Sequence, residues 1–412
     1  MSKKYFSIFF VCILIISLLT QSVFAQTYDM QYSITTPDDD VEHAEIYDET
    51  YAVLEDEASD SDESQLIYDC SEHDIEADTP LSTPDIANIN ETYTIVSDAA
   101  QVMTVNMSNV ESVFKVRRMQ EFHIKSNELY ITERCDYDGD NSQDDFAILK
   151  FTISNGVANY TSGNYTVIKN AGHGETLDCY TYNNTYYFLV GCKDADMDLG
   201  TGYDHYALQI GRVEFSAGAV YNYSSIKRLT GFGYANQNNV NNGTPLRVAA
   251  ATSGDKIVFR ALLEKNSVKY VQYSTYSLSA VNNALSNSAS SYISFASDST
   301  LQGAHLSTVY TTLASSVRPR ASFQGIEASP SSIYIAGGVE TDAYPRIASI
   351  SMTNGSFIGG VEIRGYVNQN GITVSCANKE IEGLYRTSDK IYFGIVTSIS
   401  NIVIVSVNAS DF

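Results

Sequence analysis

Five stretches of the chain repeat one pattern of apolar and polar positions. Each opens with a polar residue and a turn, continues as an apolar strand, turns on small polar residues and enters a second strand. The openings are Gln120-Glu121-Phe122, Gly174-Glu175-Thr176-Leu177, Thr244-Pro245-Leu246, Gln324-Gly325-Ile326 and Glu382-Gly383-Leu384. The second strands contain Leu129-Tyr130-Ile131, Tyr186-Tyr187-Phe188, Ile257-Val258-Phe259, Ile333-Tyr334-Ile335 and Ile391-Tyr392-Phe393.

A third strand with period-two alternation follows in every copy, and most copies continue into a fourth. The copies start about 55, 70, 80 and 58 residues apart. These periods exceed those of most propeller blades, and insertions in loops would account for the excess. Long helical patterns are absent. The pattern therefore predicts an all-β fold, a five-bladed β-propeller over residues 93–412.

The fifth copy stops at Phe412 after its third strand, so its fourth strand must come from elsewhere. The runs 93–96 and 102–107 precede the first copy and have β-character. We expect this N-terminal strand to complete the last blade and close the ring, because an open ring would expose strand edges. A β-sandwich or jelly roll is the competing fold, and the five-fold repetition argues against it.

Three openings carry a family resemblance: His173-Gly174-Glu175-Thr176-Leu177, Phe323-Gln324-Gly325-Ile326-Glu327 and Glu380-Ile381-Glu382-Gly383-Leu384. They resemble motifs of the helveticin J family, large heat-labile bacteriocins of Gram-positive bacteria. That family is also similar to teichoic-acid biosynthesis protein C and to a propeller of phage receptor-binding proteins. The resemblance implies a five-bladed propeller that acts at a bacterial cell surface, and it supplies no catalytic residues to carry over.

The N-terminal residues before the repeats differ from one another in charge, and they form two segments. Residues 1–25 read as a secretory signal peptide, with Lys3 and Lys4 before an apolar run and small residues at the cleavage site. Residues 26–92 contain 21 acidic residues and no Lys or Arg. Such a segment buries too little apolar surface to offset the entropy of ordering, so we expect a mostly disordered acidic arm. Its role as a spacer, pro-segment or binder of basic partners is left open.

The composition also limits the partners. An acidic chain without a basic patch of any size argues against nucleic-acid binding. No stretch after the signal is apolar enough to span a bilayer, so we expect a secreted, extracellular protein. We also expect it to be a monomer. The five cysteines beyond the signal fit neither a zinc ribbon nor a redox motif, and no pairing follows from them.

One loop suggests a metal. Acidic residues at alternating positions follow Cys135, with a glycine in the turn, and the candidate ligands are Asp136, Asp138, Asp140 and Asp144. Such carboxylates could converge on Ca²⁺, which takes six to eight oxygen ligands. The loop lacks the glycine and glutamate of an EF-hand at their usual places. A calcium site and a solvated acidic hairpin are both consistent with it.

Polar residues of the repeat openings form the second candidate site. In a propeller they would gather at the mouth of the central channel, and they are His173, Glu175, Gln324, Glu327 and Glu382. We expect this mouth to bind a bacterial cell-wall polysaccharide or teichoic acid. Hydrolysis of a cell-wall glycan by two of the carboxylates is the enzymatic alternative. A surface or colonisation protein without toxin activity is the third, and the same residues could simply satisfy backbone groups at a turn.

Overall fold

The alternating runs form strands at the positions that the sequence predicts. The computed structural model describes residues 91–115, 118–139, 144–194, 205–311, 313 and 318–412. In this part of the chain the strands pair antiparallel into five groups of four, numbered here in chain order. Groups 1 and 2 are β3 (Met119–Lys125), β4 (Glu128–Cys135), β5 (Asp145–Ser154) and β6 (Val157–Lys169), then β7 (Leu177–Tyr182), β8 (Thr185–Asp194), β9 (Ala207–Val213) and β11 (Lys227–Thr230).

The remaining groups follow the same order. Group 3 is β12 (Thr244–Ser253), β13 (Lys256–Lys265), β14 (Val268–Ser277) and β16 (His305–Thr311). Group 4 is β17 (Gly325–Ala328), β18 (Ser332–Gly337), β19 (Arg346–Ser351) and β20 (Phe357–Ile363). Group 5 is β23 (Glu380–Arg386), β24 (Lys390–Ser398), β25 (Asn401–Asn408) and the N-terminal β2 (Ala99–Asn106).

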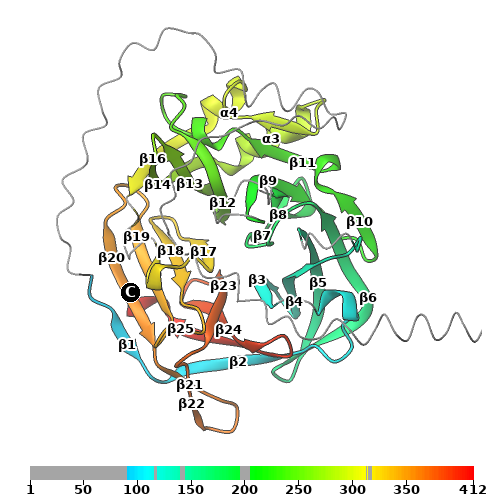
Figure 1. Ribbon diagram of the computed structural model, residues 1–412, viewed down its shortest axis with the longest axis vertical. Helices are drawn as coiled ribbons and strands as arrows, with labels where there is room; N and C mark the ends of the chain where they lie inside the picture. The colour runs from blue at the N-terminus through cyan, green and yellow to red at the C-terminus, as the bar shows by residue number, and fades with distance from the viewer. Residues whose placement is uncertain (1–90, 116–117, 140–143, 195–204, 312, 314–317) are drawn as a thin grey trace, which may run out of the picture. The chain divides into compact units, whose positions relative to one another are not determined.

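The first strands of the groups contact one another in a closed order. β3 contacts β7, β7 contacts β12, β12 contacts β17, β17 contacts β23, and β23 returns to β3. Figure 1 shows these strands near the centre, with the later strands of each group further out. Antiparallel sheets set around a common centre make a propeller-like, all-β fold.

The N-terminal strand joins the last group, as the sequence predicts. β2 pairs antiparallel with β25, from Ala100 opposite Ser406 to Val105 opposite Ile402. Its end also pairs in parallel with β6, so groups 5 and 1 are continuous in hydrogen bonding. This pairing covers the edge that the fifth copy would otherwise expose.

Further parallel strands add to the outer edges. β1 (Thr94–Val96) lies on β20, β10 (Ala219–Asn222) on β6, and β15 (Tyr292–Ser294) on β11. The hairpin of β21 (Gly365–Val367) and β22 (Thr373–Ser375) continues from β2. The run 93–96 has β-character in the sequence, and β1 lies there. Repeat periodicity does not predict the other short strands, because they belong to connections between or within copies.

An insertion explains the long third repeat. Between β14 and β16 lie the helices α3 (Leu278–Asn287) and α4 (Ser299–Ala304), with β15 between them. Ser277 begins α3 by accepting a hydrogen bond from the amide of Ala280 at 3.3 Å. Leu278, Val281 and Leu285 are buried on one face of that helix.

The core lies between neighbouring groups because each strand presents alternate residues to opposite faces. On β13, Ile257 and Phe259 belong to a buried cluster that also contains Leu189 of group 2. The intervening Val258 packs in a cluster with Ile335 of group 4. Both faces of a group are thus apolar, which is why its strands read as nearly continuous hydrophobic runs.

Several expectations fall on residues outside the described ranges. These are the signal peptide 1–25, the acidic segment up to residue 90, Cys70 and Asp140. The described cysteines Cys135, Cys179, Cys192 and Cys376 form no disulfide with one another. No helix in the described ranges is both long and apolar enough to cross a membrane.

Candidate functional site at the start of the inner strands

The repeat openings come together where the first strands begin, but they are buried. His173, Glu175, Gln324, Glu327 and Glu382 expose between 3% and 9% of their surface. The structure divides them into three neighbouring networks instead of one open cluster. Each network joins strands of different groups.

Glu175 forms the centre of the first network. Its carboxylate receives two hydrogen bonds from Arg247 of β12, one of them from Nε to Oε2 at 2.8 Å. Arg247 also donates through Nη2 to the carbonyl of Phe323, just before β17, at 2.6 Å. One buried ion pair therefore ties the beginnings of groups 2, 3 and 4 together.

Aromatic rings surround this ion pair. The guanidinium of Arg247 lies 4.0 Å from the ring centre of Tyr206 and 4.7 Å from that of Phe323. His173 packs against Tyr206 with ring centres 4.6 Å apart, and its Nδ1 lies 3.6 Å from Oε1 of Glu175. Gly174 between them has a φ of +79°, and a Cβ there would press on Phe146 and Thr132. The motif therefore needs glycine at this position.

A second buried guanidinium lies beside the first. Arg260 of β13 is 1% exposed and stacks over Phe323 with 3.8 Å between guanidinium carbon and ring centre. Within the described residues its Nε and Nη1 have no hydrogen-bond partner, nor has the hydroxyl of Tyr273. Burial lowers the pKa of Arg260 from its ordinary value. Glu175 is the carboxylate that balances this pair of arginines.

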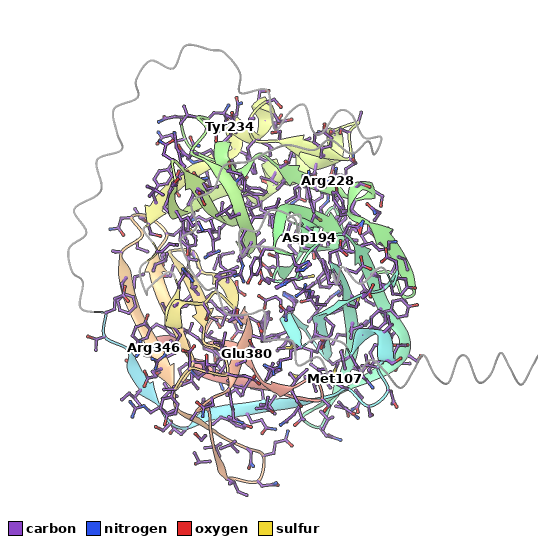
Figure 2. The ribbon with its side chains drawn as sticks, viewed as in Figure 1. Met107, Asp194, Arg228, Tyr234, Arg346 and Glu380 are labelled. Atoms are coloured by element: carbon purple, nitrogen blue, oxygen red, sulfur yellow. The ribbon has the colours of Figure 1, made fainter. Side chains whose placement is uncertain are left out.

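Gln324, Glu380 and Glu382 make the second network. Nε2 of Gln324 donates to Oε1 of Glu380 at 3.1 Å and to Oε1 of Glu382 at 3.3 Å. Arg118, just before β3, donates to Oε2 of Glu380 at 2.7 Å and pairs with Glu340 at 2.6 Å. Glu380 is labelled in Figure 2. This network joins groups 1, 4 and 5.

Three carboxylates make the third network and line a narrow axial hollow: Glu121, Asp178 and Glu327. Each accepts the amide of the residue that follows it and an amide of a neighbouring first strand. The neighbouring amides belong to Leu384, Thr252 and Arg386 respectively. The carboxylates thus fasten adjacent first strands together along the axis.

The hollow is too narrow for a ligand. No part of it is wide enough for a water molecule. Burial raises the pKa of Glu121 and of Glu327 well above the ordinary value, and each also faces Asp178. Catalysis in a glycosidase needs two carboxyl groups with a sugar between them. A space too narrow for water leaves no room for a sugar between these three carboxylates in this structure.

All five candidate residues were selected from the sequence for their position in the repeat openings, and the structure adds partners that this reasoning missed. Glu121 stands where copies four and five have Gly325 and Gly383, and its Oε1 occupies the space that a Cβ on Gly383 would need. Asp178 aligns with Glu327 at the third position after Glu175 and Gln324. Aligning the copies residue by residue would have found both.

The acidic loop after β4 is partly described. Oδ1 of Asp136 accepts the amide of Gly139 at 2.9 Å, and Asp138 pairs with Lys169 at 2.6 Å. The carbonyl of Asp144 accepts the amides of Ala171 and Gly172. Asp140 lies outside the described residues. Among those that are described, no three acidic, histidine or cysteine side chains are grouped to hold a metal ion.

Two further carboxylates lie at the ends of the strands beside these loops. Asp194, labelled in Figure 2, contacts Nδ1 of His205 through Oδ2 at 3.2 Å. Asp145, next to the acidic loop, accepts the amides of Tyr137 and Asn170 at 3.0 and 2.9 Å. Burial raises the pKa of Asp145 to about 6. These carboxylates anchor the loops around the ends of β4 and β8.

Comparison with solved structures finds distant similarities. Extracellular domains 1–2 of Drosophila semaphorin 1b share 11% identity over 70% of this chain and 63% of theirs, with a TM-score of 0.33. The β-xylosidase RS223 shares 10% identity over 72% of this chain and 93% of its own, with a TM-score of 0.38. A glycosyl hydrolase from Bacteroides ovatus shares 9% identity over 76% of this chain and 95% of its own, with a TM-score of 0.33. The chain spans less than two thirds of the semaphorin structure.

These similarities carry no conclusion about activity, and no curated protein matches the chain. A family model does match: the one described as "Bacteriocin helveticin-J" covers residues 88–345. The matched region contains the openings of copies one to four and the network around Glu175. Because the match spans more than half of the chain, this protein belongs to the helveticin J bacteriocin family.

Proposed function

We propose that this chain is a secreted, bacteriocin-like five-bladed propeller that recognises a polymer of the bacterial cell envelope. Membership of the helveticin J family is the observation that carries the proposal. The five antiparallel groups and the pairing of β2 with β25 support the assignment of five closed blades. A teichoic acid or a wall polysaccharide is the polymer class that we propose.

The geometry favours binding over hydrolysis. The carboxylates of the repeat openings and the axis already receive hydrogen bonds from the protein, and the axial hollow admits no water. Contact with a polymer would then use the more exposed side chains around the same mouth. Arg118 and Glu340 are two of these, with 23% and 33% of their side chains exposed.

The test incubates the full chain with purified cell walls, with and without their teichoic acid. Bound protein and released reducing sugar are both measured. We expect binding without sugar release. Release that is lost in Glu175→Gln or Glu382→Gln while binding persists would make the protein a hydrolase. Neither binding nor release would favour a surface protein without envelope recognition.

A second pair of variants separates the mouth from the rest of the surface. Arg118→Gln removes a cation beside the mouth, and we expect wall binding to weaken by roughly tenfold if it meets a phosphate or carboxylate. Lys265→Gln on the β13–β14 hairpin removes the same charge elsewhere, and it should leave binding unchanged. Equal effects of the two would show that binding depends on net charge alone.

We also propose that the loop carrying Asp136, Asp138, Asp140 and Asp144 binds Ca²⁺ and so stabilises the mouth. The support is the alternation of carboxylates in the sequence and the fixed backbone on both sides of the loop. The lysine that pairs with Asp138 would have to be displaced by the ion.

A further inference from the structure

Three arginines converge on one carboxylate at the outer part of group 4. Glu362 of β20 accepts hydrogen bonds from Arg320 at 2.9 Å and from Arg346 at 2.7 Å on Oε2, and from Arg364 at 3.0 Å on Oε1. We call Arg320, Arg346 and Arg364 the arginine cluster. Arg346 is labelled in Figure 2.

The cluster has a surplus of positive charge. Burial alone would raise the pKa of Glu362, but the hydrogen bonds from Arg346 and Arg364 outweigh it and leave this pKa below its ordinary value. Glu362 is therefore ionised and balances one of the three cations. Among the described residues, Nε of Arg346 also donates to Oε2 of Glu362 at 3.1 Å, and Nε of Arg320 donates to the carbonyl of Tyr344 at 2.8 Å.

The three arginines can contact a further partner because their side chains are more exposed than that of Glu362. Their side chains are 22%, 27% and 44% exposed, in chain order, whereas that of Glu362 is 9% exposed. Each guanidinium carries five donors in a planar fork that suits carboxylates. The surplus charge thus faces solvent with unused donors.

The N-terminal segment enters the described structure at this cluster. Strand β1 pairs with β20 so that Ile95 lies opposite Glu362, and the carbonyl of Val96 accepts the amide of Arg364 at 2.7 Å. The ring of Tyr93 lies 4.6 Å from the guanidinium carbon of Arg346. Residues 26–90, immediately upstream, contain 20 acidic residues and no Lys or Arg.

We propose that the arginine cluster is a docking surface for the part of the chain's own acidic segment that adjoins it, residues 42–90. Asp85 is eight residues from Tyr93, and an extended chain covers about 3.3–3.6 Å per residue, so it can reach the cluster. Attachment at Tyr93 gives the acidic side chains an effective concentration on the order of millimolar at the cluster. A free anionic ligand has to compete with this local concentration.

The inference does not depend on the proposed function, because it concerns two parts of one chain. It has a consequence for partners: an external polyanion could occupy the cluster only by displacing the acidic segment. Since the docking is electrostatic and partly exposed, it should weaken strongly with salt, as the Debye length falls from about 10 Å at 0.1 M to about 3 Å at 1 M.

The experiment measures how fast a glutamate-specific protease cuts the acidic segment of the full chain. The variant is Arg346→Gln with Arg364→Gln, which leaves Arg320 to balance Glu362. The control is Lys265→Gln with Lys269→Gln, which removes the same charge from group 3. Thermal melting of each variant shows that the domain remains folded, and an unstructured peptide reports the protease's own response to salt.

At low salt we expect cutting of the parent and of the control to be roughly threefold to tenfold slower than cutting of the arginine variant, as a few exposed charge pairs allow. High salt should remove the difference. Added polyphosphate should accelerate cutting of the parent by competing for the cluster. Equal rates for parent and arginine variant, or no response of the parent to salt, would overturn the proposal.

Two outcomes identify other occupants. Protection that rises with protein concentration would assign the cluster to the acidic segment of a second copy. If polyphosphate binds the parent but not the arginine variant, and the rate of cutting does not change, the cluster is a site for an external polyanion. Either result would refute docking within one chain.

Discussion

The ion pair between Glu175 and Arg247 provides the sharpest test of how the ring mouth is held together. Glu175→Gln keeps the shape of the side chain but removes its charge. Arg247 and Arg260 would then be two buried cations, each 1% exposed, without the carboxylate that balances them. The amide could accept one hydrogen bond from Arg247, and its NH₂ group would face the guanidinium.

The expected loss follows from the burial of the pair. Removing one partner of a buried ion pair costs about 3–5 kcal/mol, and the remaining hydrogen bond places this case near the lower end. With an unfolding entropy of about 2.1 cal/mol/K per residue, a loss of about 3 kcal/mol lowers Tm by about 4–5 °C in a domain of about 320 residues.

The assay is thermal unfolding followed by calorimetry and circular dichroism. Glu340→Gln is the matched control, because Glu340 also pairs with an arginine but is one third exposed, and it should change Tm by less than about 1 °C. Glu175→Gln combined with Arg247→Met removes both charges and should recover part of the loss. A Tm of Glu175→Gln within about 1 °C of the parent would refute the reasoning.

Three further predictions test other parts of the fold. The carboxylate oxygens of Glu133 have no hydrogen-bond partner in the described structure, and burial raises the pKa of Glu133 well above the ordinary value. The free energy of unfolding that depends on Glu133 is therefore highest at acid pH, and it declines as the pH rises above the ordinary pKa. Glu133→Gln should therefore flatten the fall in Tm between pH 5 and pH 8 (about one to four units above the ordinary pKa of Glu), and an unchanged slope would contradict this. A chain that begins at Val110 lacks β2 and should lose cooperative unfolding, whereas one that begins at Ile89 should keep it; equal stability of the two would reject closure by β2. Calcium should raise the Tm of the parent but not that of Asp138→Ala, and no shift in the parent would leave only an acidic hairpin.

The strands could be predicted because their signal is local. Period-two alternation and the short polar turns placed both strands of each repeat opening, and the missing fourth strand of the last copy indicated that β2 would pair with β25. Helix α3 was missed although Leu278, Val281 and Leu285 have helical spacing after Ser277. The strand pattern recurs in every copy, whereas this helix belongs to an insertion that occurs once.

The roles of the site residues could not be predicted in the same way. The sequence marks Glu175 and Glu382 as polar residues at equivalent positions, but their partners lie far away along the chain. Arg247 is 72 residues from Glu175, and Leu384 is 263 residues from Glu121. Whether a carboxylate faces solvent or an arginine of the next group depends on how the groups pack, which no local pattern records.

The same contacts constrain how this chain can use its repeat openings. A carboxylate that holds two first strands together is already paired before any ligand arrives, and a sugar hydroxyl would have to displace a charge-assisted hydrogen bond that is stronger than the one it offers. Under the proposed function, recognition would therefore use the more exposed side chains at the margin of these networks, such as Arg118 and Glu340. If so, Glu175→Gln and Glu382→Gln weaken wall binding and stability together, whereas Glu340→Gln changes binding with little change in Tm. Parallel loss in all three would mean that the mouth contributes to binding only by being folded.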